Sequence, residues 1–285
     1  SFFATLLAVA LLARAAPALG LTDKPSSRKR HQGEVPMVGG IAIFIALSIA
    51  GTLWGNANQT LITVNGNEAL WVFMMCGAFL VLTGMLDDRF QLGVFMRVLS
   101  EVMVAIAVIE FLDLRVAHLG DIFGFGIITI NPILAYPFTV IAIFGIINAF
   151  NMLDGMDGLL GSLVITTLIM FHLFTGTAPG FVSLAIGAAL LAFLVSNLGL
   201  SPIVPKTFLG DAGSKLLGFI VVCLLLAAAS AQVGQIKLVQ PVTALFIVAL
   251  PLFDMVFTSL RRIIRKGSPF AADRSHIHHL MQDLG

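Results

Sequence analysis

The sequence predicts an all-α, polytopic membrane protein that forms one domain over residues 1–285, with about nine transmembrane helices. Of its 285 residues, 58% are hydrophobic and only 11% are charged, whereas a typical soluble domain has about 25% charged residues. The mean hydropathy is +1.01. Apolar runs close to the roughly 20 residues that cross a membrane recur along the chain. A soluble protein and a protein with a single membrane anchor are therefore excluded.

Apolar segments follow one another with short polar loops between them. They lie near residues 1–13, 39–54, 69–86, 97–112, 132–150, 159–175, 180–199, 213–231 and 240–260. The first has only 13 apolar residues before Arg14, too few to cross a membrane, so we expect it to belong to a longer helix. A cleaved signal peptide is the alternative, but such a peptide carries its basic residue before the apolar run.

Lysine and arginine are distributed unevenly between the two sides of this topology. Fourteen of the 16 basic residues fall at segment ends or loops on one side, and only Arg115 and Lys237 fall on the other. The positive-inside rule makes the first side cytoplasmic. Polar residues follow the same division, because all five polar clusters fall on that side. These clusters are residues 22–40, 86–93, 148–158, 206–215 and 261–279.

Polar groups next to a membrane are costly and usually functional, so five clusters on one face predict a shared site. The segments that run outward from this face begin there, and helix N-termini bind anions. Gly39, Gly40, Gly155, Gly158, Gly210 and Gly213 stand close to three of these starts, where glycine permits tight turns and close approach of a ligand. Together with the basic loops, this pattern favours a phosphorylated substrate. A transporter would instead place its charges near the membrane midplane.

Carboxylates repel phosphate unless a cation neutralises both. Mg²⁺ prefers oxygen ligands and is often held by one or two carboxylates together with substrate phosphates. Asp211, the pair Asp87 and Asp88, and either Asn151 or Asp154 offer such oxygens. Each cluster also has a simpler interpretation: the aspartate pair as a solvated helix end, Gly210 and Asp211 as a turn and helix cap, and the histidines as a zinc site or plain surface.

With these residues in view, the chain resembles the polyprenyl-phosphate N-acetylhexosamine-1-phosphate transferases, over essentially its whole length. DKPSSRKRHQGEVPMVGG, LDDRF, NAFNMLDGMDGLLG, FLGDAGS and SPFAADRSHIHHL match the motifs of that family in order. The HIHH sequence favours the branch that uses UDP-N-acetylglucosamine over the muramyl-pentapeptide branch, which has an HHHFE-like motif. Members of the family tend to continue through one or two further membrane segments after the histidine motif.

The resemblance implies that UDP-N-acetylglucosamine and undecaprenyl phosphate give undecaprenyl-diphospho-N-acetylglucosamine and UMP. It implies a requirement for Mg²⁺, with Mn²⁺ as an alternative ion, and a multi-pass protein of the bacterial inner membrane with catalytic loops in the cytoplasm. The product would begin a surface polysaccharide of the O-antigen or common-antigen type. Another UDP-N-acetylhexosamine or a UDP-linked deoxy sugar remains open as donor, as does a homodimer. A lipid or nucleotide-sugar transporter is a distant alternative, and no nucleic-acid partner is expected.

The resemblance also implies roles for individual residues. Asp211 and Asn151 match metal-binding positions, and Asp87 and Asp88 match a pair assigned to catalysis or to arranging the lipid phosphate. The positions that match substrate-binding motifs are Asp154 and Asp157 (nucleotide or metal), His276, His278 and His279 (sugar-nucleotide diphosphate), and Asp23, Lys29 and His31 in the first loop.

One departure from the family concerns Gln91, which stands where close relatives have a third acid. This substitution puts in doubt any mechanism that needs that carboxylate. We expect a single in-line displacement in which the lipid phosphate attacks the sugar-bearing phosphorus. A phosphate monoester with a second pKa near ~6 is already ionised at neutral pH, so Asp87 is expected to orient the attacking phosphate rather than remove a proton. A covalent aspartyl-phosphate intermediate is the alternative.

Overall fold

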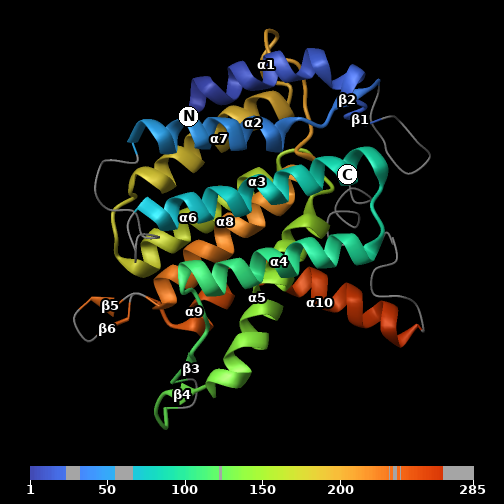
Figure 1. Cartoon of the computed structure of the whole chain (residues 1–285). Coiled ribbons are helices and arrows are strands. Elements are labelled where there is room, and N and C mark those ends of the chain that lie inside the picture. Colours follow the sequence, from blue (N-terminus) through green and yellow to red (C-terminus); the bar gives the residue numbers. More distant parts are fainter. Residues whose placement is uncertain are drawn as a thin grey trace.

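The computed structural model describes residues 1–23, 33–54, 67–121, 124–230, 232–233, 236–237 and 239–265 (Figure 1). The helices are α1 (Phe2–Leu19), α2 (Gly39–Trp54), α3 (Asn67–Phe90), α4 (Val94–Leu112), α5 (Pro132–Leu153), α6 (Leu159–Thr175), α7 (Phe181–Asn197), α8 (Gly210–Ser230), α9 (Pro241–Ile247) and α10 (Ala249–Ile264). The strands form three antiparallel pairs. They are β1 (Thr22–Asp23) with β2 (Val35–Pro36), β3 (His118–Gly120) with β4 (Ile128–Thr129), and β5 (Gln232–Val233) with β6 (Ile236–Lys237).

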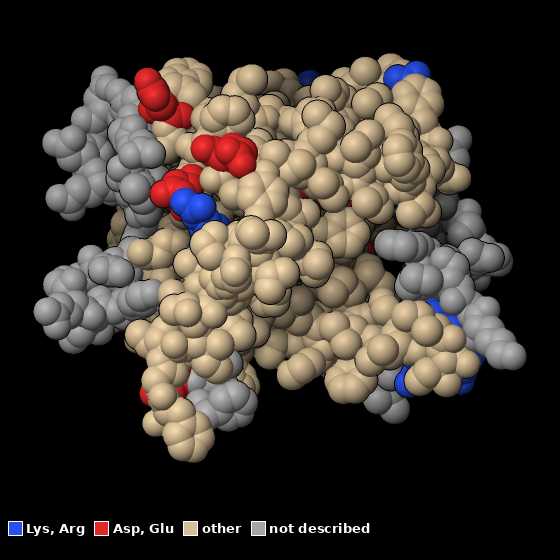
Figure 2. Space-filling view, turned by 60° about the horizontal axis from the view of Figure 1, so that its bottom comes forward, with Lys and Arg blue, Asp and Glu red and all other residues tan. Residues whose placement is uncertain are grey.

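Several of these helices have the length and composition of membrane spans. Four described helices, at Phe2–Leu19, Glu68–Phe90, Pro132–Leu153 and Gly210–Ser230, are long and apolar enough to cross, and α9 with α10 is a fifth candidate if the bent pair is one span. The α2, α6 and α7 helices are shorter and apolar. Large apolar side chains such as Phe3 and Ile133 are more than four-fifths exposed. Figure 2 shows a face on which Lys, Arg, Asp and Glu are sparse. The chain is therefore a multi-pass membrane protein.

The expected segment at 240–260 is a broken one. The α9 and α10 helices meet at an angle of 80° around Val248. Pro251 lies in the first turn of α10 and is buried. A proline lacks an N–H, and its ring clashes with the carbonyl four residues earlier. That residue is Ile247, where α9 ends.

The first expected segment is also longer than its apolar run. The α1 helix continues through Arg14 and Pro17 to Leu19. It ends at Gly20, which has φ +69° and whose N–H donates to the carbonyl of Pro17 at 3.2 Å. Glycine adopts this left-handed conformation without steric cost, which makes it a common helix terminator. The helix is therefore long enough to be a candidate span.

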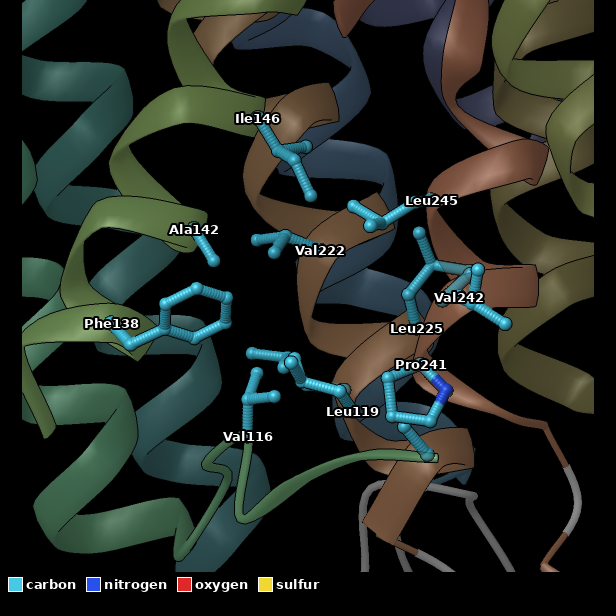
Figure 3. Close-up of a pocket in the computed structure, with 13 residues that line it drawn as sticks. Val116, Leu119, Phe138, Ala142, Ile146, Val222, Leu225, Pro241, Val242 and Leu245 are labelled. Carbon is cyan, nitrogen blue, oxygen red and sulfur yellow. The ribbon is translucent and has the colours of Figure 1, made fainter. Parts of the chain in front are cut away.

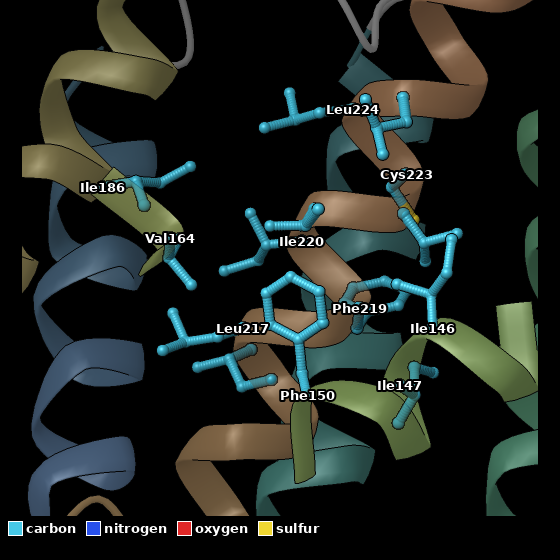
Figure 4. Close-up of a cluster of buried hydrophobic side chains, with 14 of the residues drawn as sticks. Ile146, Ile147, Phe150, Val164, Ile186, Leu217, Phe219, Ile220, Cys223 and Leu224 are labelled. Carbon is cyan, nitrogen blue, oxygen red and sulfur yellow. The ribbon is translucent and has the colours of Figure 1, made fainter. Parts of the chain in front are cut away.

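The α8 helix lies at the centre of the bundle, and Ala212–Ala228 are buried. Figure 4 shows side chains from α5, α6 and α7, including Phe150, Val164 and Ile186, gathered around it. Small residues allow this packing. A Cβ atom added to Gly40 of α2 would lie 2.2 Å from the Cα of Gly213, and one added to Gly84 of α3 would lie 2.4 Å from the Cα of Ala212. The glycines at 40 and 213, expected to admit a ligand, instead admit another helix.

The two ends of the bundle differ in chemistry. The β3–β4 and β5–β6 pairs lie at one end, and β1–β2 with the α3–α4 turn lie at the other (Figure 1). An apolar pocket near the β3–β4 end is lined by α5, α8, α9 and the segment after α4, with Phe138, Val222 and Leu245 among its residues (Figure 3). It lacks the polar groups that a sugar nucleotide requires. The described residues of the clusters 22–40, 86–93, 148–158 and 206–215 lie at the opposite end.

Candidate active site

Polar side chains from three helix ends meet where α3 and α5 finish and α8 begins. Asp88, near the end of α3, accepts hydrogen bonds from the backbone N–H groups of Asp211 at 3.0 Å and Ala212 at 3.5 Å. The first N–H groups of a helix have no partner within the helix, and a negative charge is favourable at this end. Asp88 therefore caps α8 and fixes the start of that helix against α3.

Asp87 points into the protein and is only 2% exposed. One carboxylate oxygen accepts from the N–H of Leu92 at 2.9 Å. The other pairs with Arg97 Nε at 2.9 Å and with Lys215 Nζ at 3.3 Å. The chain turns here because Gln91 adopts φ +51°, an uncommon conformation for a residue other than glycine. Gln91 is exposed in this turn.

The side chains of Asp87 and Asp211 also lie within hydrogen-bonding contact of each other, and the charge of Asp88 is close to both. Carboxylates at such distances repel unless a proton or a cation lies between them. This cluster, with Asp211 and Asp88 near the N-terminus of α8, offers oxygen atoms of the kind that a divalent cation prefers as ligands.

The end of α5 contributes amides and a carboxylate. Asn151 accepts a hydrogen bond from Ser214 Oγ of α8 at 2.5 Å. Asn148, one turn earlier, donates to the carbonyl of Phe144 at 2.9 Å and to the Glu101 carboxylate of α4. The two asparagines therefore bind different helices, although they lie on one side of α5. Asp154 follows as the C-cap of α5 and is partly buried.

Burial, together with the nearby charges of Asp88 and Asp157, raises the pKa of Asp154 from 3.8 to about 7. Native Asp154 thus holds its proton up to higher pH than in the unfolded chain. The stability that this contributes is fully present below about pH 3.8 and is lost as the pH rises from there through about 7.

Asp154→Asn removes the ionisation. Without divalent cations, we expect the variant to melt only slightly above wild type at about pH 5 and several degrees above it at about pH 8. Thermal denaturation of the purified protein in detergent with a chelator checks this. An equal difference at both pH values would contradict the role assigned to burial of this carboxyl group.

The loop after α5 is held by a second set of contacts. Asp157 pairs with Lys206 at 2.5 Å, with both side chains about 40% exposed. The N–H of Gly158, which has φ +75°, donates to Asn197 Oδ1 at 2.6 Å, and Asn197 Nδ2 donates to the carbonyl of Thr207 at 2.9 Å. Thr207 in turn donates to the carbonyl of Pro36 at 2.7 Å. The described parts of four expected clusters are therefore joined at one end of the bundle.

The remaining site predictions fall in different places. Asp23 lies in β1, opposite Val35 of β2. The other candidates lie outside the described residues, and they are Lys29, His31, His276, His278 and His279.

Sequence reasoning missed three charged residues that surround Asp87. Arg97 is half-buried, while Lys215 and Glu101 are 1% exposed, and Lys215 Nζ lies 3.6 Å from Glu101 Oε1. The available signal was Glu101 itself, a carboxylate inside an apolar segment, since charged residues in such segments usually serve a function.

The oxygen atoms of these side chains suit a hard cation such as Mg²⁺. Such an ion usually takes some of its ligands from water and phosphate rather than from the protein. Among the described residues, no three His, Cys, Asp or Glu side chains form a complete metal site. Such an ion could be held here only with further ligands from the substrate, in addition to Asp211, Asp88, Asn151 and Asp154.

Comparisons with known proteins give a consistent result. Residues 70–229 match the family described as glycosyl transferase family 4. A protein of Salmonella typhi, an undecaprenyl-phosphate alpha-N-acetylglucosaminyl 1-phosphate transferase, is 38% identical over 288 residues, which cover 100% of this chain and 75% of the relative. Proteins of the same name from Yersinia pestis (38%, covering 94% and 71%) and Haemophilus influenzae (36%, covering 100% and 78%) are similar too.

Proposed function

The chain belongs to glycosyl transferase family 4, and on this premise we propose that it transfers N-acetylglucosamine-1-phosphate from UDP-N-acetylglucosamine to undecaprenyl phosphate. The products are undecaprenyl-diphospho-N-acetylglucosamine and UMP. The observation that carries the proposal is 38% identity over the full chain to enzymes with this printed name. The carboxylates around the start of α8 supply the groups that phosphoryl transfer needs.

The proposed setting is the bacterial inner membrane, with nine segments crossing and the carboxylates at the cytoplasmic face. This orientation is supported by the basic residues, because 14 of the 16 in the chain fall at segment ends and loops on that side. The product then begins a surface polysaccharide of the O-antigen or common-antigen type. No nucleic acid takes part, and the protein works as a monomer or a homodimer.

In the proposed site, Asp211 and Asn151 hold Mg²⁺ or Mn²⁺, with Asp88 at the start of the same helix. The ion would neutralise charge on the diphosphate. Asp154 and Asp157 bind the nucleotide side of the donor. The first-loop residues Asp23, Lys29 and His31 and the histidines His276, His278 and His279 complete the substrate site.

The reaction is proposed as one in-line displacement. An oxygen of the lipid phosphate forms a bond to the sugar-bearing phosphorus, and the bond from that phosphorus to the bridging oxygen breaks, so that UMP leaves. Asp87 orients the attacking phosphate through the geometry of the carboxylate cluster. Asp87 is buried and pairs with Arg97 and Lys215, and these contacts fix the orientation of its carboxylate, which supports this role.

Asp87→Asn is expected to lower kcat by about 10²-fold, because misplacing reacting groups by ~1 Å has this effect. The loss should be the same from about pH 6 to about pH 9. If Asp87 were instead the general base, the activity of the variant would recover as the pH rises. Release of UMP measured across this range checks it. Near-complete recovery of activity at high pH would establish Asp87 as the base instead.

The donor is tested with a panel of sugar nucleotides. Purified protein is supplied with undecaprenyl phosphate, Mg²⁺ and either UDP-N-acetylglucosamine, UDP-N-acetylgalactosamine or a UDP-linked deoxy sugar, and UMP is measured. The proposal predicts fastest release from UDP-N-acetylglucosamine and none without the lipid. Release from no donor would contradict the function, and a faster second sugar would change the assigned donor. Labelled phosphosugar trapped on the protein without lipid would support the covalent route.

A further inference from the structure

A group of buried charges lies behind the site aspartates. Lys215 of α8 and Glu101 of α4 are each 1% exposed, and Asp87 of α3 is 2% exposed. Lys215 Nζ lies 3.3 Å from Asp87 Oδ2 and 3.6 Å from Glu101 Oε1. Asn148 of α5 donates to the other oxygen of Glu101. Four helices therefore meet at one polar junction in the interior.

Stability alone does not explain these charges. Transferring a charge into a protein interior costs several kcal/mol even after relaxation, and well-packed apolar residues often replace a buried ion pair at no loss. The α8 helix is otherwise buried against apolar side chains along most of its length. An ammonium and a carboxylate at this place therefore call for a role beyond holding the helices together.

The contacts form a continuous path to the reaction site. Glu101 contacts Lys215, Lys215 contacts Asp87, and Asp87 contacts Asp211. The positive charge of Lys215 offsets the repulsion between neighbouring carboxylates, and in a buried place this attraction is stronger than in water. Glu101 in turn limits the positions that the Lys215 ammonium can occupy.

We propose that Lys215 and Glu101 are a positioning pair for the transfer reaction, in which Glu101 anchors the Lys215 ammonium and Lys215 fixes the carboxylate of Asp87 against Asp211. This inference rests on the proposed function. Neither residue of the pair touches the substrate. Both act through Asp87, whose orientation must be kept within a fraction of an ångström for full activity.

The test compares the double variant Lys215→Met/Glu101→Gln with wild type. It removes both charges together, because Lys215→Met alone leaves Glu101 buried without its cation and risks unfolding. We expect a melting temperature within about 5 °C of wild type, KM values for both substrates within about threefold, and kcat lower by about 10²-fold. Glu110→Gln is the matched control, because Glu110 is an exposed carboxylate on α4, the helix that also contains Glu101. This variant should retain the wild-type kcat.

A second measurement asks whether Lys215 acts through Asp87. If it does, adding Asp87→Asn to the double variant lowers kcat no further than Asp87→Asn alone, whereas independent effects would multiply. A double variant that unfolds, that keeps the wild-type kcat, or whose loss multiplies with that of Asp87→Asn would overturn the inference. The wild-type rate in the same assay separates the two claims, since no UMP from wild type would reject the proposed function itself.

Discussion

Replacing Asp211 with Asn is expected to lower kcat by about 10³-fold while the protein stays folded. The Asp211 carboxylate lies among Asp87 and Asp88 at the start of α8, and its charge is the part that the variant loses. The variant retains the hydrogen bond that the backbone N–H of residue 211 donates to Asp88 at 3.0 Å. The cap of α8 therefore survives, and the loss falls on cation binding and on the transition state. Removing one of several clustered carboxylates should leave the melting temperature unchanged or raised.

The measurement is UMP release together with Mn²⁺ binding followed by electron paramagnetic resonance. Asp113→Asn is a matched control, because Asp113 is exposed at the far end of α4 and pairs with Arg115 at 2.9 Å. This control is expected to keep the wild-type kcat and the wild-type Mn²⁺ affinity. An Asp211→Asn protein that retained more than about a tenth of the wild-type kcat would remove Asp211 from the site.

Gly40→Ala is expected to have the largest effect on folding. The new Cβ atom would lie 2.2 Å from both the Cα and the N of Gly213, and backbone atoms cannot move aside as a flexible side chain can. Overpacking of this kind costs about 1–3 kcal/mol and sometimes more. The clash also moves α2 away from the first turn of α8, where Asp211 lies, so the folded fraction should lose activity as well.

Gly51→Ala is the matched control for this effect, since Gly51 lies in the same helix and a Cβ atom there meets nothing within 4 Å. It is expected to be neutral or slightly stabilising, because alanine favours helix over glycine by up to ~1 kcal/mol. Thermal denaturation in detergent compares the two variants. Equal melting temperatures for Gly40→Ala and Gly51→Ala would show that α2 and α8 do not pack through these glycines.

The apolar segments could be located from the sequence because the thickness of a membrane sets their length. The expected ranges 39–54 and 159–175 coincide with α2 and α6. Hydropathy did not locate the ends of α3 and α5, which continue beyond the apolar runs to Phe90 and Leu153. Helices can continue into polar sequence where caps and side chains satisfy the backbone. It also missed the bend at Val248, which depends on one proline inside an apolar run.

The meeting of four of the five polar clusters could also be predicted, because they share one side of the expected topology. The division of labour between neighbouring aspartates could not. Adjacent residues on a helix point in different directions, so Asp88 caps α8 while Asp87 faces Arg97 and Lys215. The simpler alternative for Gly210 and Asp211 is a turn and helix cap, but the first N–H groups of α8 are capped by Asp88, 123 positions earlier in the chain. Pairings of this range depend on helix packing, which a single sequence does not reveal.

The central claim is that a phosphosugar, rather than a sugar, is transferred to the lipid. Purified protein is given UDP-N-acetylglucosamine labelled with ³²P at the β-phosphate, together with undecaprenyl phosphate and Mg²⁺, and Asp211→Asn serves as the control. The account predicts that the label moves into the lipid product, that unlabelled UMP appears in equal amount, and that the variant gives almost none of either. Label that stays in released UDP while the lipid gains only the sugar, or label that never reaches the lipid, would contradict it.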